Sequence, residues 1–178
     1  MPQGLKILKF LLLYPISLIY GIVVSTRNFF YDTNIIKSKS YDFPVISIGN
    51  LTVGGTGKTP HVEYIAGLLK NDFNIAILSR GYKRKTRGFR IANSDDDASV
   101  IGDEPMQMKE RFPGITVAVD EKRSRGIEIL CKEDELNAIV MDDAFQHRRV
   151  KAGLNILLSD YHRPFTKDHY LPYGRLRE

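Results

Sequence analysis

The sequence has almost no cysteine and no internal repeat. A single cysteine, Cys131, stands among 178 residues, so an internal disulfide and a multi-cysteine zinc site are both excluded. No internal repeat or low-complexity linker is apparent. The proportions of hydrophobic (43%) and charged (26%) residues are those of an ordinary globular protein. The sequence therefore predicts one folded core in a reducing compartment, and disordered, fibrous and disulfide-stabilised secreted classes are excluded.

The charge balance is only mildly one-sided. The 26 Lys and Arg against 21 Asp and Glu leave a net charge of +5, which is compatible with nucleotides, phosphorylated lipids, nucleic acid or an anionic membrane. Nucleic acid is not expected as a partner, because the basic stretch at residues 80–90 is short and no recognised binding module accompanies it. Charge alone does not choose among the other partners.

The longest apolar run is short for a membrane span. Residues 10–24 are uncharged over 15 positions, whereas a bilayer span takes about 20 apolar residues. The residues that follow match a signal-peptide cleavage site poorly. Basic flanks, with Tyr14 and Tyr20 at the boundary, fit a helix lying in the membrane interface. A buried core helix is an equally good interpretation of this run.

A strand, a glycine-rich loop and a helix follow one another from residue 43. FPVISIGNL predicts a short strand and HVEYIAGLLK a helix, and TVGGTGKT lies between them. A phosphate-binding loop needs this order, because the amides of a glycine-rich turn and a helix N-terminus must converge on the phosphate oxygens. In such a loop Lys58 reaches the β- and γ-phosphates and the Thr59 hydroxyl binds Mg²⁺. The loop residues expected to hold the nucleotide are Thr52, Val53, Gly54, Gly55, Thr56, Gly57, Lys58 and Thr59.

The loop departs from the standard pattern at one position. Thr52 stands where the first glycine of G-x-x-x-x-G-K-[ST] belongs. A glycine-rich turn at the start of an ordinary helix therefore remains the alternative at this point. A second element favours the nucleotide interpretation, since the apolar strand NAIVMDD ends in Asp142 and Asp143. A carboxylate at the end of a neighbouring parallel strand holds Mg²⁺ in P-loop enzymes.

The remaining pattern alternates strands with helices. Strands are predicted at residues 74–79, 115–119 and 154–160, and helices at 105–111 and 121–132. This alternation predicts an α/β protein of P-loop NTPase type, with a mainly parallel sheet, helices on both faces and an apolar N-terminal helix before it. The ligand crevice is expected at the carboxyl ends of the strands, after Leu51, Ser79, Val119 and Met141.

Charged residues follow several of these strands. Arg80 begins a basic loop that suits an anionic substrate or a lipid headgroup, although a solvated hairpin explains its lysines equally well. Asp103 is either a simple helix cap or the base that orients an attacking hydroxyl. Arg123 and the arginines around His147 are candidates for holding phosphate or transition-state charge, and His147 itself has no ligand-spaced partner for a metal.

Taken together, five motifs resemble one family, the tetraacyldisaccharide 4′-kinases that act in lipid A biosynthesis of Gram-negative bacteria. They are GNLTVGGTGKTP (49–60), LSRGY (78–82), GDEP (102–105), DDAFQH (142–147) and LPYGRLRE (171–178). The family tolerates a residue other than glycine where Thr52 stands. The resemblance implies ATP-dependent phosphorylation of the 4′-hydroxyl of a tetraacylated glucosamine disaccharide 1-phosphate, which gives lipid IVA at the cytoplasmic face of the inner membrane.

The resemblance also implies residue roles and partners. Lys58 and Thr59 correspond to the phosphate and Mg²⁺ contacts, Asp142 and Asp143 to the metal-binding pair, and Asp103 to the catalytic base. Lys58 and Asp143 join Asp103 as the residues expected to act in catalysis. Arg80, Arg123 and His147 match the family motifs less specifically, and the resemblance implies that they contact substrate or phosphate. The implied partners are ATP, Mg²⁺, an anionic acylated glucosamine disaccharide lipid and the surface of the inner membrane.

Members of this family continue past the LRE sequence into a second lobe. We therefore expect a membrane-associated helix and connector at residues 1–40 and a P-loop kinase lobe at 41–178, which alone binds nucleotide weakly at best. Robust phosphorylation of the lipid by the 178-residue chain would overturn this expectation. Two other classes remain as alternatives: a P-loop GTPase or metallochaperone-type NTPase, and a non-catalytic membrane-associated nucleotide-binding module. The first lacks support, because no Asn-Lys-x-Asp element follows a later strand.

Overall fold

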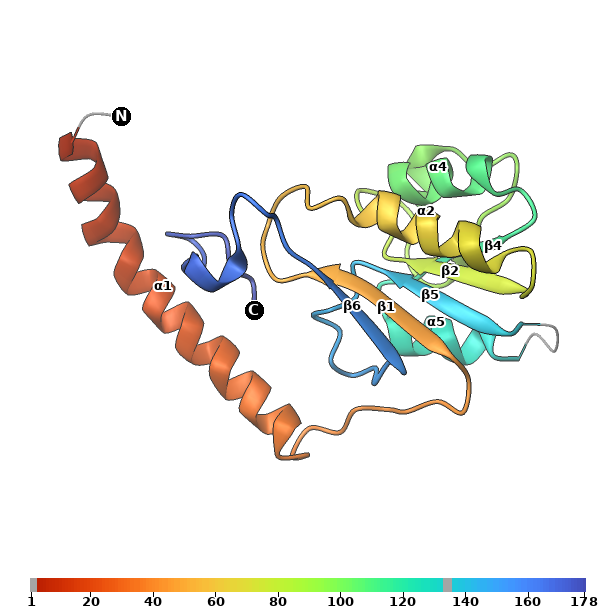
Figure 1. The fold of residues 1–178 in the computed structure, drawn as a ribbon, viewed down its shortest axis with the longest axis horizontal. Helices are drawn as coiled ribbons and strands as arrows, with labels where there is room; N and C mark the ends of the chain where they lie inside the picture. Colours follow the sequence, from red (N-terminus) through yellow and green to blue (C-terminus); the bar gives the residue numbers. More distant parts are fainter. Residues whose placement is uncertain (1–2, 133–135) are drawn as a thin grey trace. The chain divides into compact units, whose positions relative to one another are not determined.

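A computed structural model describes residues 3–132 and 136–178 (Figure 1). The first two residues of the expected N-terminal segment lie outside the described part of the chain. The chain divides into two compact units. The first comprises Met1–Ser38, Asn50–Thr56 and Leu158–Glu178, and the second comprises Lys39–Gly49 and Gly57–Leu157. The expected division at residue 40 stays a prediction.

Within the described residues, the sheet has six strands in the order β3-β4-β2-β5-β1-β6. Their bounds are β1 Val45–Asn50, β2 Ile75–Ser79, β3 Arg90–Ile91, β4 Thr116–Val119, β5 Ala138–Asp142 and β6 Leu154–Leu158. β5 pairs in parallel with β1 and with β2, and β2 pairs in parallel with β4. The mainly parallel α/β sheet is thus confirmed. The short β3, which pairs antiparallel to β4, was not predicted because two residues carry no periodic signal.

Three crossover helices cover the two faces of the sheet. They are α2 Lys58–Leu69, α4 Asp103–Arg111 and α5 Arg123–Leu130. Figure 1 shows α2 and α4 on one face and α5 on the other, as expected for right-handed crossovers. A further short helix, α3 Ala98–Ile101, was not predicted from the polar run before it. Its N-cap is Asp97, whose carboxylate accepts from the amides of Ser99 and Val100.

The core lies between the central strands and α5. Leu78, Ile139 and Met141 are almost completely buried, with Leu130 of α5 packed into the same cluster. A Cβ on Gly126 would lie 2.9 Å from the Leu78 side chain, so glycine permits α5 to approach β2 closely. β2 and β5 are buried along their whole length, which explains why they read as unbroken apolar runs. This core fixes the carboxyl edge of the sheet as a rigid platform.

The first unit contains the N-terminal helix and the C-terminal segment. The helix α1, Gln3–Asp32, is twice as long as the uncharged run that predicted it, because helical structure continues past charged residues on both sides. By length and composition, Ile7–Asp32 suffices to cross a membrane, so the expectation of too short a helix was wrong. One side of α1 contacts the C-terminal segment, through the Tyr14 ring against His169 and Tyr173.

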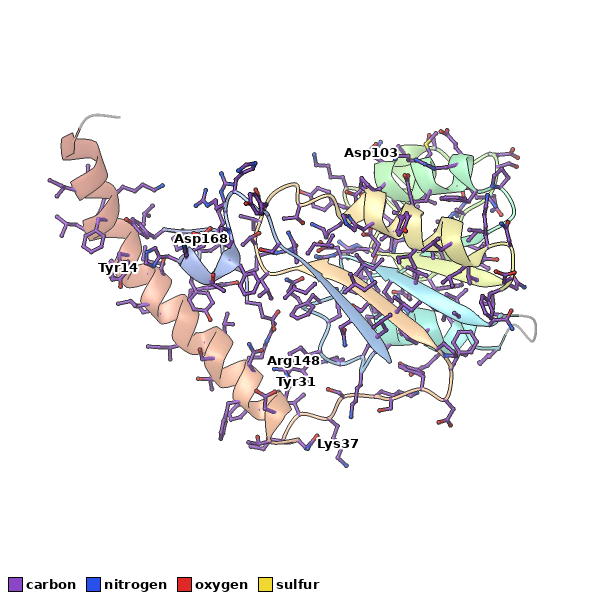
Figure 2. The ribbon with its side chains drawn as sticks, viewed as in Figure 1. Tyr14, Tyr31, Lys37, Asp103, Arg148 and Asp168 are labelled. Atoms are coloured by element: carbon purple, nitrogen blue, oxygen red, sulfur yellow. The ribbon has the colours of Figure 1, made fainter. Side chains whose placement is uncertain are left out.

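The other side of α1 is exposed and apolar. Among the described side chains of α1, the large apolar ones that are more than half exposed are Ile7, Leu8, Leu11, Leu12, Ile16, Leu18, Ile19, Ile22, Val23 and Phe29. A monomeric soluble surface rarely carries such a continuous apolar face. The C-terminal segment includes η1, Phe165–Lys167, followed by Asp168, which Figure 2 labels together with Tyr14 of α1.

Candidate functional site

Three strands of the second unit end side by side at the expected crevice. Ser79 at the end of β2 pairs with Val119 of β4, and Leu78 pairs with Met141 of β5. Asp142 closes β5 and pairs with Ile48 of β1. Because parallel strands place their carboxyl ends at one edge, the residues that follow them face a common site. The carboxyl ends of β2, β4 and β5 therefore lie together at the sheet edge where the crevice was predicted.

The predicted nucleotide loop is divided between the two units. Gly57 belongs to the second unit and forms the N-cap of α2 with φ 75°, in the left-handed region that glycine adopts without strain. Gly57 has no side chain to cap the first amides of α2, so the amides of Lys58 and Thr59 face outward from the helix terminus. Amides at such a terminus, together with the helix dipole, favour a bound anion.

Lys58 links this helix terminus to the acidic pair. Its Nζ lies 3.7 Å from Oδ1 of Asp143, and the two side chains are 16% and 35% exposed. Asp143 adopts a positive φ of 45°, a conformation that aspartate tolerates better than bulkier residues do. The ion pair holds a cation and a carboxylate at the same site, as phosphate and metal binding both require.

Asp142 is held in an unusual electrostatic state. It is 1% exposed, its Oδ2 accepts from the Ser79 hydroxyl at 3.2 Å, and its Oδ1 is buried with no hydrogen-bond partner among the described residues. Burial, followed by the nearby charges of Glu104 and Asp143, raises the pKa of Asp142 to about 6. A buried carboxylate with an unsatisfied oxygen and like-charged neighbours is stabilised by a cation.

The donor set fits Mg²⁺. Asp142 and Asp143 offer hard oxygen ligands, which this ion prefers. Within residues 3–132 and 136–178, no group of three His, Cys, Asp or Glu side chains is close enough to form a complete cage. That matches an ion usually held by one or two carboxylates and by substrate phosphates. Asp142, Asp143 and the Thr59 hydroxyl are the residues that would hold it.

Replacing Asp142 with asparagine is expected to stabilise the ligand-free chain while weakening Mg²⁺-nucleotide binding. The raised pKa means that stability falls as pH rises from about 4 to 6, because the folded state retains the proton longer than the unfolded state. Without metal at pH 7.5, Asp142→Asn should raise the free energy of unfolding by about 3 kcal/mol. Urea denaturation in EDTA measures this gain, which should disappear below about pH 4. An equal gain at both pH values would contradict the assignment.

Asp103 lies in the first turn of α4 and is exposed (Figure 2). The N-cap of α4 is Gly102, so the simple capping interpretation of Asp103 was wrong. The neighbouring Glu104 is close enough to influence Asp142. The first turn of α4 thus places the Glu104 carboxylate near the acidic pair.

Gly102 determines how α4 begins. Its φ is 96°, and an added Cβ would lie 2.9 Å from the backbone oxygen of Tyr82. Gly102→Ala should therefore destabilise the chain by about 1–3 kcal/mol, through strain and a backbone clash. Thermal unfolding measures the loss. Gly114→Ala is the control, because an added Cβ there meets nothing within 4 Å. Equal effects of the two substitutions would contradict the strain at Gly102.

The three residues predicted to contact substrate, Arg80, Arg123 and His147, differ in how deeply they are buried. Arg123 is only 1% exposed, and its guanidinium donates to the backbone oxygens of Asp120 and Asp142, the latter at 3.1 Å. Burial lowers the pKa of Arg123 to about 10, partly offset by Asp142. Arg123 therefore ties the ends of β4 and β5 together. Arg80 is exposed after β2, and His147 is half-buried in a turn that its amide closes onto Ala144.

Sequence reasoning missed two polar clusters near this edge. The Arg84 side chain, 2% exposed, contacts Glu121 at 2.5 Å and the Gly88 backbone oxygen at 2.7 Å, so it fixes the basic loop that begins at Arg80. Asp120 is fully buried and accepts two hydrogen bonds from Arg125. Only the position of Asp120 directly after a strand signalled its importance.

The first unit holds the other part of the loop, Thr52–Thr56. Gly54 has φ 121°, and the amide of Val53 donates to the Arg175 oxygen at 2.8 Å. Asn50 is completely buried and donates to the Thr56 hydroxyl at 2.8 Å. A cavity of about 30 Å³ adjoins this stretch, and its lining includes Asp160, Arg163, Asp168 and Arg175. Asn50 was not predicted as a site residue.

A strand, a glycine turn and a helix, with an acidic pair ending the adjacent parallel strand, define an α/β protein of the P-loop nucleotide-binding class. The chain belongs within it to the tetraacyldisaccharide-1-P 4′-kinase family, whose model matches residues 9–178. The family resemblance seen in the motifs is thereby confirmed.

Individual relatives agree with this assignment. The tetraacyldisaccharide 4′-kinase of Bacteroides thetaiotaomicron is 56% identical over 168 residues, covering 93% of this chain and 44% of the relative. That of Bacteroides fragilis is 55% identical over 178 residues, covering 99% and 47%. A crystal structure of LpxK from Aquifex aeolicus, described as an "apo" form in complex with ATP, matches with TM-score 0.84 and 41% identity, covering 93% of this chain and 53% of that one. The chain spans about half the length of the curated relatives it matches.

Proposed function

We propose that this chain forms the nucleotide-binding lobe of an ATP-dependent lipid kinase. The reaction transfers the γ-phosphate of ATP to the 4′-hydroxyl of a tetraacyldisaccharide 1-phosphate and gives lipid IVA. The family assignment and the ATP held by the Aquifex aeolicus protein support this proposal. The observation that carries it is the 3.7 Å ion pair between Lys58 and Asp143, which joins the helix terminus to the acidic pair.

The residues divide the work by chemistry. Lys58 and the first amides of α2 bind the phosphates, which concentrates positive charge where the transferred group carries negative charge. Mg²⁺, when bound by Asp142, Asp143 and Thr59, neutralises phosphate charge. Asp103 accepts the proton of the 4′-hydroxyl while the hydroxyl oxygen forms a bond to the γ-phosphorus. The bond between that phosphorus and the oxygen that bridges it to the β-phosphate breaks, and ADP leaves. Arg123 holds β4 and β5 in register beneath these groups.

The apolar N-terminal helix suits an enzyme whose substrate is a lipid. The exposed apolar face of α1 would bury its side chains among acyl chains, as interfacial helices do. We infer that α1 anchors the protein at the cytoplasmic face of the inner membrane. Flotation with anionic phospholipid vesicles tests this, and deletion of residues 1–24 should abolish the partitioning. Unchanged partitioning would remove the membrane interpretation.

Nucleotide selectivity separates the proposal from a GTPase. Titration calorimetry with Mg-ATP and Mg-GTP should show preference for ATP in the 178-residue chain. Preference for GTP would favour the GTPase class. Because the chain spans about half of its relatives, phosphate transfer is assayed in a chimera that places the C-terminal half of the Bacteroides fragilis relative after Glu178. This protein is called the chimera below.

A further inference from the structure

The last residues of the chain lie against the phosphate loop within the first unit. The amide of Arg177 donates to the Leu51 oxygen at 2.7 Å, and the Arg175 oxygen accepts from Val53 at 2.8 Å. Thr52 and Leu176 form an antiparallel bridge between these two bonds. The segment therefore pairs with the loop as a short strand would, although the two are more than 120 residues apart in sequence.

The side chain of Arg177 extends this contact to the interior of the loop. Its Nη2 donates to the side-chain Oδ1 of Asn50 at 2.5 Å and to the backbone carbonyl oxygen of Asn50 at 3.4 Å. Asn50 is fully buried and uses its amide nitrogen to donate to the Thr56 hydroxyl at 2.8 Å. Accepting from Arg177 orients the Asn50 amide group so that its nitrogen faces Thr56. Arg177, Asn50 and Thr56 thus form one relay across the loop.

The helix α1 also contacts this C-terminal segment. The Tyr20 hydroxyl donates to the Arg177 oxygen at 3.0 Å, and the Tyr173 amide donates to the Ser17 hydroxyl at 2.9 Å. Arg27 also forms an ion pair with Glu178. Arg177 is therefore held at its backbone by α1 and by the loop, and its side chain is aimed at Asn50.

We propose that Arg177 is a positioning residue, which acts through Asn50 to hold the phosphate loop in its nucleotide-binding conformation. The proposal rests on the proposed function, since it takes residues 52–59 as the ATP site. A loop with three glycines loses much conformational entropy when it is ordered around phosphate. A relay that orders it beforehand removes part of that cost and tightens binding.

Arg177→Gln removes the guanidinium and is expected to weaken ATP binding by about tenfold, the factor for one charge-assisted hydrogen bond. Tyr20→Phe loses one neutral hydrogen bond at the supporting helix and should weaken binding about twofold. Lys167→Ala, which removes an exposed charge from the same segment, is the matched control and should change nothing. Circular dichroism confirms that each variant is folded before calorimetry with Mg-ATP.

A double-mutant cycle distinguishes positioning from direct contact with the nucleotide. If Arg177 acts through Asn50, Arg177→Gln and Asn50→Ala together should weaken binding no more than Asn50→Ala alone. Losses that multiply, or Arg177→Gln binding like the unmodified chain, would overturn the proposal.

Amide hydrogen exchange without nucleotide provides a readout independent of ATP. Exchange at residues 50–57 should be faster in Arg177→Gln and unchanged in Lys167→Ala. Unchanged loop exchange in Arg177→Gln overturns the relay. If the chimera fails to bind ATP, the proposed function fails, while the exchange result still decides the role of Arg177.

Discussion

Asp103→Asn in the chimera should lower kcat for phosphate transfer by about a thousandfold, within the range for loss of a general base. Asparagine keeps the shape of the side chain but cannot accept the proton of the attacking hydroxyl. ATP affinity should remain within about twofold, because an interaction made only in the transition state lowers kcat and kcat/KM together. Steady-state kinetics with a tetraacyldisaccharide 1-phosphate measures both quantities.

The control for this substitution lies on the same helix. Glu110→Gln removes an exposed carboxylate near the C-terminal end of α4, whereas Asp103 lies in the first turn of the same helix. It should leave kcat unchanged. Equal losses in the two variants would show that charge on α4, and not a base at residue 103, supports turnover.

Lys58→Met should weaken Mg-ATP binding to the 178-residue chain by about a hundredfold, because it removes the charge-assisted contact to the β- and γ-phosphates. Methionine retains the length of the side chain, so the packing of the aliphatic part is preserved. The substitution also breaks the ion pair with Asp143. Titration calorimetry measures the change.

Lys70→Met at the opposite end of α2 is the matched charge-removal control. It should bind ATP like the unmodified chain, and full ATP affinity in Lys58→Met would contradict the phosphate role. Comparing Lys58 with Asp103 also tests the class of protein. A kinase loses turnover with either substitution, whereas a nucleotide-binding module responds to Lys58→Met and ignores Asp103→Asn.

The acidic pair illustrates how a functional site opposes stability. Asp142 is buried, one of its oxygens has no hydrogen-bond partner in the described part of the chain, and its raised pKa reports a folded state that disfavours its charge. A residue chosen for stability alone would be neutral at this position. Retaining the carboxylate is understandable if a cation compensates its charge when nucleotide binds.

The parts of the fold that were predictable carry local signals. The strand residues around Leu78 and Met141 are buried on both faces, so their unbroken apolar runs marked them as parallel strands. Gly57, Lys58 and the acidic pair were recognisable because their order along the chain reflects a requirement of phosphate binding.

The parts that were missed depend on contacts between distant residues. Arg84 meets Glu121 across 37 positions, and Arg177 meets Asn50 across 127, so no local pattern reveals either pair. The substrate contact of Arg123 stays a prediction, but the burial of its side chain was not predictable because it depends on the packing of α5 against the sheet. The length of α1 was underestimated because a charged residue ends an apolar run without ending a helix.

The most direct test of the kinase proposal is mass spectrometry of tetraacyldisaccharide 1-phosphate incubated with Mg-ATP and the chimera. The account predicts the mass increase of one phosphate, located at the 4′-position by fragmentation, and its loss in the Asp103→Asn chimera. A folded chimera that binds ATP but adds no phosphate to the lipid would contradict it.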